Sequence, residues 1–142
     1  MSFQWLQMRI TEEQDRRDRE AQILARLPKV LDEVRESIVV CVENYKESFG
    51  PESIELFQLG LKISVTVREE MGGRWEKSGK VEITVVTKLP GLHIDRNGDP
   101  LDIEVGLLPG EKTFYKDVEE FLTMEELTRR ILDRTLFPKL GE

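Results

Sequence analysis

Cysteine and histidine are nearly absent from this sequence. Its 142 residues include one cysteine, Cys41, and one histidine, His93. A lone cysteine excludes an internal disulfide and agrees with a reducing compartment, and a lone histidine excludes metal sites built on several imidazole ligands. Long apolar runs are also missing: none approaches the ~20 residues that span a bilayer, and the opening residues lack the basic and apolar regions of a signal peptide. We therefore expect a cytoplasmic protein that does not enter a membrane.

The chain has no excess of positive charge either. Its 28 aspartate and glutamate residues outnumber 21 lysine and arginine residues, which gives a formal net charge of −7. Because such a chain repels phosphate backbones, nucleic-acid binding would require a local basic face, and Arg16, Arg17 and Arg19 are interleaved with acidic residues. The glycines form neither a dinucleotide-binding fingerprint nor a Walker pattern. The sequence thus predicts no nucleic-acid partner and no cofactor.

What the chain does contain is enough apolar sequence for one domain of ordinary size. We divide it into an N-terminal helical extension, residues 1–20, and a single α+β domain, residues 21–142. The extension begins with apolar residues and continues with a polar stretch, which ion pairs four residues apart would support as a helix. The candidate pairs are Glu12 with Arg16 and Glu13 with Arg17.

From Ala21 onward, apolar residues recur in steps of three and four and predict a long helix that ends at Gly50 and Pro51. Pro28 should kink this helix or mark a boundary, because proline lacks an N–H and clashes with the preceding turn. Residues 37–44 are apolar nearly all round, so we expect that turn to be covered on more than one side. The stripe consists of Leu24, Leu27, Leu31, Val34, Ile38, Val42, Tyr45 and Phe49.

Alternation of apolar and polar residues predicts strands over residues 59–68 and 80–88. The residues between them suggest a long hairpin connection, with room for an extra paired segment around Trp75. A short strand is expected near residues 113–116, and a C-terminal helix begins after Thr123, where a glutamate three residues on completes a capping box. The residues expected to face inward are Leu59, Leu61, Ile63, Val65 and Val67 in the first strand and Val81, Ile83 and Val85 in the second.

The stretch HIDRNGDPLDIEV, residues 93–105, predicts a β-hairpin rather than a metal loop. Asn97 and Gly98 form a favoured type I′ turn, and apolar partners then stack on one face of the hairpin. A calcium loop fails because Pro100 stands where the sharp-turn glycine is needed. The resulting cross-strand pairs are Leu92 with Ile103, His93 with Asp102, and Ile94 with Leu101.

Together these elements predict an α+β fold. An antiparallel sheet of four to five strands forms one layer, and a long N-terminal helix and a C-terminal helix cover its apolar face, in the order α-β-β-β-β-α.

The polar candidate site consists of His93, Asp102 and Glu104. An imidazole oriented by a carboxylate could act as a general base. Catalysis would also need a nucleophile or an open metal position, so a weak cross-strand pair on an exposed sheet face is the preferred interpretation. Cys41 lies among valines, which indicates a small buried packing residue rather than a reactive thiol.

The partner-binding candidate is the apolar start of the extension. Such a cluster must bury itself against its own domain, a second subunit or another protein. Its residues are Phe3, Trp5, Leu6, Met8 and Ile10.

Two functions of different class follow from these candidates. The first is a non-enzymatic interaction protein, most simply a homodimer. In size, acidity and the grouping of helices around an antiparallel sheet, the chain is similar in outline to secretion chaperones, which hold an extended segment of an effector. The second is a small-molecule binder or enzyme with a pocket between sheet and helices or around His93 and Asp102.

Overall fold

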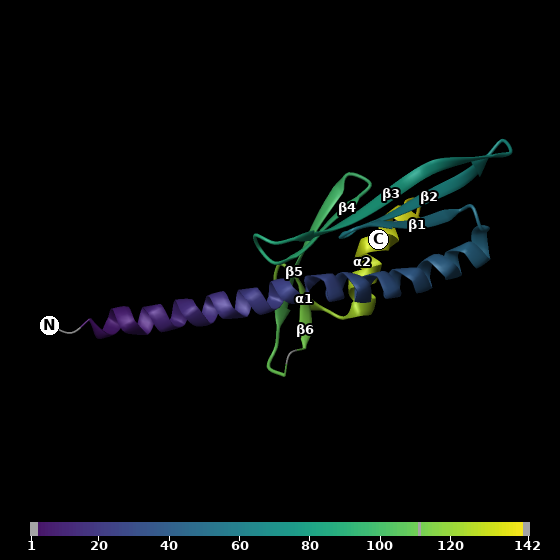
Figure 1. Ribbon diagram of the computed structural model, residues 1–142. Coiled ribbons are helices and arrows are strands. Elements are labelled where there is room, and N and C mark those ends of the chain that lie inside the picture. The colour runs from purple at the N-terminus through teal and green to yellow at the C-terminus, as the bar shows by residue number, and fades with distance from the viewer. Residues whose placement is uncertain (1–2, 111, 141–142) are drawn as a thin grey trace.

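The computed structural model describes residues 3–110 and 112–140. It confirms the α+β class, with a long helix at the start and a shorter one at the end (Figure 1). The sheet has more strands than expected, seven instead of four or five. The elements are α1 (Gln4–Phe49), β1 (Ile54–Leu59), β2 (Lys62–Met71), β3 (Arg74–Val86), β4 (Gly91–Arg96), β5 (Asp99–Leu107), β6 (Thr113–Asp117), β7 (Glu120–Leu122) and α2 (Met124–Leu136).

The seven strands form a meander in which every strand pairs antiparallel with the next one in the chain. One extra strand arises because the predicted strand over residues 59–68 is divided by a tight turn at Gly60, which has a φ of 59°. Leu59 ends β1 just before this turn, and Leu61 lies in the turn itself. Both are exposed, so the expectation that they face the core was wrong. Apolar and polar residues alternate in phase through the turn, and alternation alone cannot reveal a reversal of direction.

The long connection expected between residues 68 and 80 is itself paired. β2 and β3 continue to a two-residue turn at Gly72 and Gly73, and Glu70 lies opposite Trp75. The extra paired segment around Trp75 is therefore confirmed, as an extension of the same two strands. β7 was not expected, because its three residues, 120–122, are too few to show a period.

The predicted hairpin over residues 93–105 is confirmed residue by residue, including the pair of His93 with Asp102. Asn97 and Gly98 have φ values of 56° and 94°, as a type I′ turn requires. The carboxylate of Asp95 also accepts a hydrogen bond of 2.7 Å from the backbone N–H of Gly98. Turn chemistry and side-chain alternation thus select the same register.

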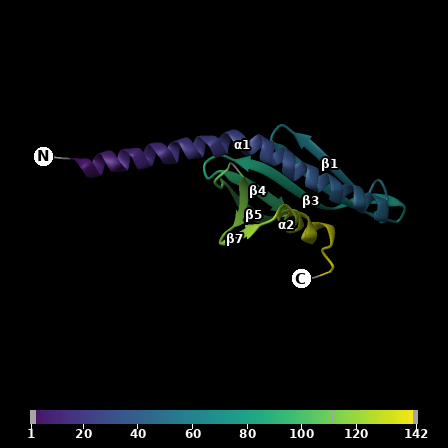
Figure 2. The same ribbon diagram turned by 90° about the horizontal axis from the view of Figure 1, so that it is seen from below.

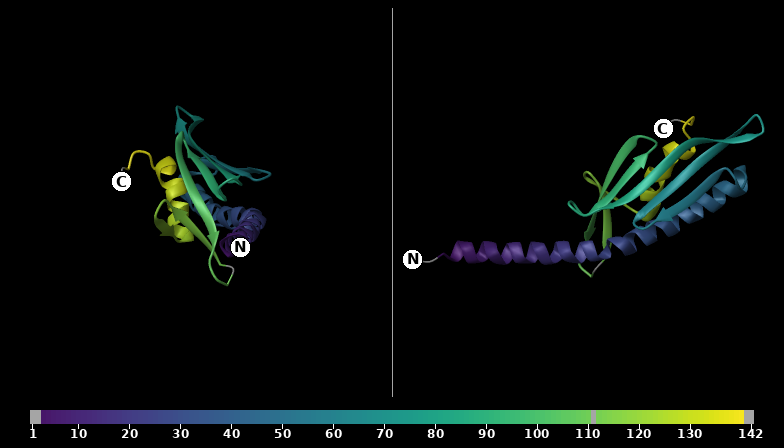
Figure 3. Two further views of the ribbon diagram at one scale, coloured as in Figure 1. Left: turned by 90° about the vertical axis from the view of Figure 1, so that its left-hand side faces the viewer. Right: turned by 45° about the horizontal axis from the view of Figure 1, so that its top comes forward.

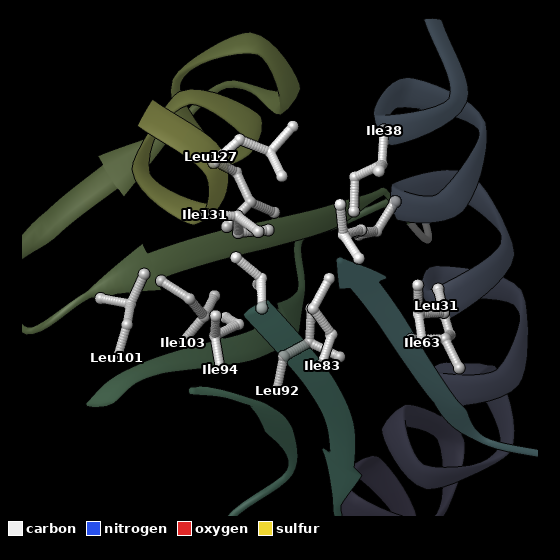
Figure 4. Packing of buried hydrophobic residues seen from close by; sticks show 14 of the residues in the cluster. Leu31, Ile38, Ile63, Ile83, Leu92, Ile94, Leu101, Ile103, Leu127 and Ile131 are labelled. Carbon is white, nitrogen blue, oxygen red and sulfur yellow. The ribbon is translucent and has the colours of Figure 1, made fainter. Parts of the chain in front are cut away.

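The hydrophobic core lies between one face of the sheet and the two helices. α1 packs against β1, β3 and β5, and α2 packs against β3, β4 and β7, so both helices cover the same face (Figure 2). Figure 4 shows Leu31 and Ile38 of α1 and Ile131 of α2 approaching the side chains of the central strands. All three are fully buried, and the opposite face of the sheet carries the polar residues of each strand.

Helix α1 is continuous, with Pro28 inside it. Figure 3 (right) shows the helix changing direction about halfway along. Pro28 accounts for the bend, because it has no N–H to give to the carbonyl of Leu24 and its ring crowds that turn. Burial along the described helix begins at Leu27, and the earlier half projects away from the body (Figure 1). The domain boundary at residue 20 stays a prediction.

The turn over residues 37–44 is covered on one side only. Ile38 is fully buried, whereas Val40 is 61% exposed, so the expectation of cover on several sides was wrong. Cys41 is half-buried and packs at the margin of the core, and this burial raises the pKa of its thiol. A raised thiol pKa agrees with a packing role and disfavours a reactive thiolate.

Substitution of two neighbouring positions on α1 tests this arrangement. Ile38→Ala should lower the free energy of unfolding by about 2–5 kcal/mol, because it leaves a cavity in the core. Val40→Ala, the matched control two residues away, should change it by less than about 0.5 kcal/mol. Urea titrations followed by circular dichroism measure both, and equal losses would show that Val40 is buried as well.

The predicted capping box at the start of α2 is confirmed. The backbone N–H of Glu126 donates to the hydroxyl of Thr123 at 3.1 Å, and the Glu126 carboxylate accepts from the backbone N–H of Thr123 at 3.1 Å. These bonds hold the pKa of Glu126 below its ordinary value of 4.5.

Acid should therefore weaken the start of α2. Because folding lowers the pKa of Glu126, its contribution is complete above pH 4.5 and is lost as the pH falls through the lowered pKa. Glu126→Gln should flatten this part of the pH–stability curve. Glu125→Gln, which removes a carboxylate of the same turn but not of the capping box, should not. Thermal unfolding between pH 2 and pH 6 compares the two variants.

Candidate interaction surface

The apolar cluster at the tip of α1 is exposed. Within the described structure, its five side chains are 40–64% accessible, and none belongs to the hydrophobic core. In the described structure, this cluster is therefore not buried against its own domain. We call this set the tip cluster; its members are Phe3, Trp5, Leu6, Met8 and Ile10.

A charged segment, residues 11–22, separates the tip cluster from the body. Arg16 bonds to Glu13 at 2.8 Å and to Glu20 at 2.6 Å, while the predicted pair of Glu13 with Arg17 is present at 3.3 Å. Hydrogen bonds from Arg16 hold the pKa of Glu13 down to about 2. The segment is exposed, so ion pairs along the helix support it in place of burial. It acts as a spacer between tip and body. The other predicted pair, Glu12 with Arg16, is replaced by Glu12 with Arg9 at 2.9 Å.

The tip cluster continues the helix face that packs on the sheet. The buried residues Leu27, Leu31 and Val34 follow one another in steps of four and three. The same steps traced backward pass three charged residues and reach Ile10, Leu6 and Phe3. Such spacing is the repeat of a helix that packs against another helix. Because an α-helix has 3.6 residues per turn, this line winds slowly around α1, as it does in a supercoiled pair.

An apolar groove of about 720 Å³ lies where α1 leaves the body. In Figure 1, the β3–β4 and β5–β6 connections flank the helix at this level. Leu89 and Val118 in its wall are 85% and 83% exposed, so the groove is open to solvent. We call it the helix-exit groove; its apolar wall is formed by Ile23, Val86, Leu89, Pro90, Phe114 and Val118.

A glycine shapes one side of the helix-exit groove. A Cβ atom on Gly106 would lie 2.2 Å from the ring of Phe114, so only glycine lets that ring lie flat over β5. Phe114 is also held edge-on by Phe121, with ring centroids 5.3 Å apart. The groove wall is thus fixed by packing. Arg19, Asp102, Glu104 and Lys116 add charged groups to the lining.

Comparison with known protein families, with curated proteins and with solved structures finds no match to this chain. Among the described residues, no helix is both long enough and apolar enough to cross a membrane. Evidence on function therefore comes from the surfaces of the chain itself.

The polar candidate site is a shallow feature of the outer sheet face. His93 Nδ1 lies 2.6 Å from Asp102 Oδ1, but the Asp102 side chain is 79% exposed. Glu104 lies on the same face opposite Lys116, one step away from this pair. Nowhere in residues 3–110 and 112–140 do three metal-binding side chains gather. The geometry is that of a cross-strand polar pair.

Sequence reasoning found the tip cluster and the polar pair but missed the helix-exit groove. The groove is built from four separate parts of the chain, around Ile23, Leu89, Glu104 and Phe114. The only local signal is Leu89, an apolar residue in a turn between Lys88 and Pro90. A single exposed leucine is common on protein surfaces and carries little information.

A double-mutant cycle tests the interpretation of His93. The coupling energy between His93→Ala and Asp102→Ala should be about 0.2–1 kcal/mol, as for other exposed cross-strand pairs. His93→Ala and Glu104→Ala should be additive within about 0.3–0.5 kcal/mol, because these residues share no bond. Urea unfolding provides all the values. A coupling energy of several kcal/mol would instead indicate a buried, functional pair.

Proposed function

We propose that this protein is a non-enzymatic protein-interaction module that offers the tip cluster of α1 to a protein partner. The observation that carries the proposal is the exposure of five large apolar side chains on a regular helix, held away from the body by a charged spacer. We further expect this interaction to take place in the cytoplasm.

The tip cluster has the spacing of a helix that docks in a groove. Phe3, Leu6 and Ile10 stand at positions i, i+3 and i+7, the pattern by which an amphipathic helix inserts its side chains into an apolar partner surface. Burial of one such side chain contributes about 1.5–3 kcal/mol. Trp5 adds the residue type that most often dominates binding energy at interfaces. The cluster is therefore large enough to drive association.

The spacer determines where a partner can bind. Residues 11–22 rise about 18 Å along the helix axis at 1.5 Å per residue. The part of a partner that binds the tip cluster therefore lies beyond the sheet, not on it. This mode of binding differs from the one that the outline likeness to secretion chaperones suggested, because those proteins hold an extended segment of an effector.

A small-molecule function has weaker support. The core side chains of Figure 4 occupy the space between the sheet and the helices. The polar pair of His93 and Asp102 lies open on the outer face. Neither place has the enclosed apolar cavity with converging polar groups that is typical of ligand sites.

Tagged proteins isolated from their own cells under native conditions test the proposal. Wild-type protein should carry a bound protein, a second copy or another chain, and Leu6→Asp with Ile10→Asp should remove it, because two carboxylates cannot be buried in an apolar groove. Gln14→Asp with Gln22→Asp is the matched control, since it adds the same charge to exposed positions of the same helix outside the tip cluster. Native mass spectrometry identifies what remains bound.

The same experiment defines the contrary outcomes. A wild-type protein that is always monomeric and free of other proteins would contradict the proposal. A small molecule retained equally by all three proteins would favour the alternative function. The folding of each variant is checked by its unfolding midpoint at low concentration, which should not change because these side chains are exposed.

A further inference from the structure

We infer that the partner is a second copy of this chain, bound antiparallel along the first half of α1, so that each tip cluster occupies the helix-exit groove of the other copy. This inference rests on the proposed function and names its partner. It joins two apolar surfaces, the tip cluster and the helix-exit groove, that lie apart on one chain.

A chain cannot fill its own groove with its own tip. Ile10 and Ile23, at the near ends of the two surfaces, are separated by 13 residues of one continuous helix, which corresponds to about 20 Å. The tip also points away from the body (Figure 1). The occupant of the groove must therefore come from another molecule.

A second copy satisfies both surfaces at once. When two identical helices lie antiparallel, the tip of each lies beside the point where the other enters its body. The contact is then isologous, with the same surface used by both copies and closed by a two-fold axis. The line of residues that continues from the buried face of α1 supplies the seam between the two helices.

The sequence of this seam favours one register. Placing Leu6 opposite the partner's Leu24 sets Glu13 opposite the partner's Arg17, which pairs leucine with leucine and acid with base, twice by symmetry; Ile10 then meets Glu20, and Phe3 meets Leu27 at the edge of the partner's core. A shift of one heptad outward sets all three tip residues of the seam opposite charged residues. A shift of one heptad inward sets all three opposite residues that are buried in the partner's body. The register that remains also brings the tip to the groove.

The tip cluster is apolar on two sides of the helix, as enclosure requires. At 100° per residue, Trp5 and Met8 project nearly opposite to Phe3, Leu6 and Ile10. A helix that only lay along another helix would bury one side. A tip inserted into a groove buries both, and the helix-exit groove is lined both by α1 and by residues of the sheet and its turns.

The start of α1 carries a partial positive charge that the carboxylates of the groove can meet. Phe3 gives no side-chain cap to α1, and its first turn carries no acidic residue, so the N–H groups there keep the partial positive charge of a helix start. The lining of the groove includes Asp102 and Glu104, next to Arg19 and Lys116. Carboxylates near a helix N-terminus are stabilising.

Site-specific crosslinking tests the register in a Cys41→Ala background. Mixing Ile10→Cys chains with Glu20→Cys chains should give a disulfide-linked heterodimer, because positions 10 and 20 face each other in this register. Either variant alone should give none, since like positions are then about 15 Å apart along the axis, beyond the 4.4–6.8 Å Cα separation of a disulfide. Reducing and non-reducing gels report the product.

The groove is tested by sedimentation equilibrium of full-length variants. Leu89→Asp should raise the dimer Kd by about tenfold or more, since it buries a carboxylate in an apolar contact. Leu140→Asp, a change of the same kind at an exposed leucine outside the groove, should leave the dimer unchanged. Leu6→Asp with Ile10→Asp should weaken it as Leu89→Asp does.

Three outcomes would overturn the inference. Ile10→Cys chains that crosslink to themselves would show a parallel pair or an antiparallel pair centred on residue 10, and in neither do the tips reach the grooves. A dimer that Leu89→Asp leaves intact would exclude the groove. A chain that stays monomeric up to its solubility limit would exclude a second copy. If the chain is monomeric but binds a different protein, and Leu6→Asp with Ile10→Asp removes that protein, the proposed function stands and only this inference fails.

Discussion

Burial of one face of the sheet beneath two helices is the constraint on which the rest of the structure depends. The seven strands form a simple meander, so each strand finds its neighbour next in the chain, but a sheet with one apolar face is stable only when that face is covered. Leu31 and Ile38 of α1 and Ile131 of α2 provide that cover. Because the second half of α1 is held on the sheet, the direction of its first half is fixed as well. The exposed tip is thus a consequence of how the core is packed.

The parts of the fold that could be predicted are those where two local signals agree. In the hairpin around Asn97, turn chemistry and side-chain alternation demand the same register, and the structure has it. The box of Thr123 and Glu126 gave the start of α2 in the same way. Around Gly60 only one signal existed, alternation, and it continued unchanged through a turn. Strand number was therefore underestimated where the chain reverses without a change of pattern.

The candidate sites, too, could be predicted only in part from the sequence. The composition of the tip cluster is visible in the sequence, but whether it folds back is not, because that depends on the direction of the half of α1 before the bend at Pro28. The helix-exit groove was invisible because Ile23, Leu89 and Phe114 come together only in space. His93, the residue that first attracts chemical interest, proves to be one half of an exposed pair. Rarity of a residue type did not indicate function here.

The proline in α1 has a thermodynamic consequence. It interrupts the hydrogen-bond ladder at Leu24, so the projecting half can lose helical order by itself while the body stays folded. A helical segment without tertiary support is only marginally stable in water, and a bound partner would supply that support. Binding strength then includes the free energy of ordering this half. Residues of the spacer that face away from the seam, such as the exposed Asp18, contribute to affinity through helix propensity, which makes the spacer an adjustable part of the interaction.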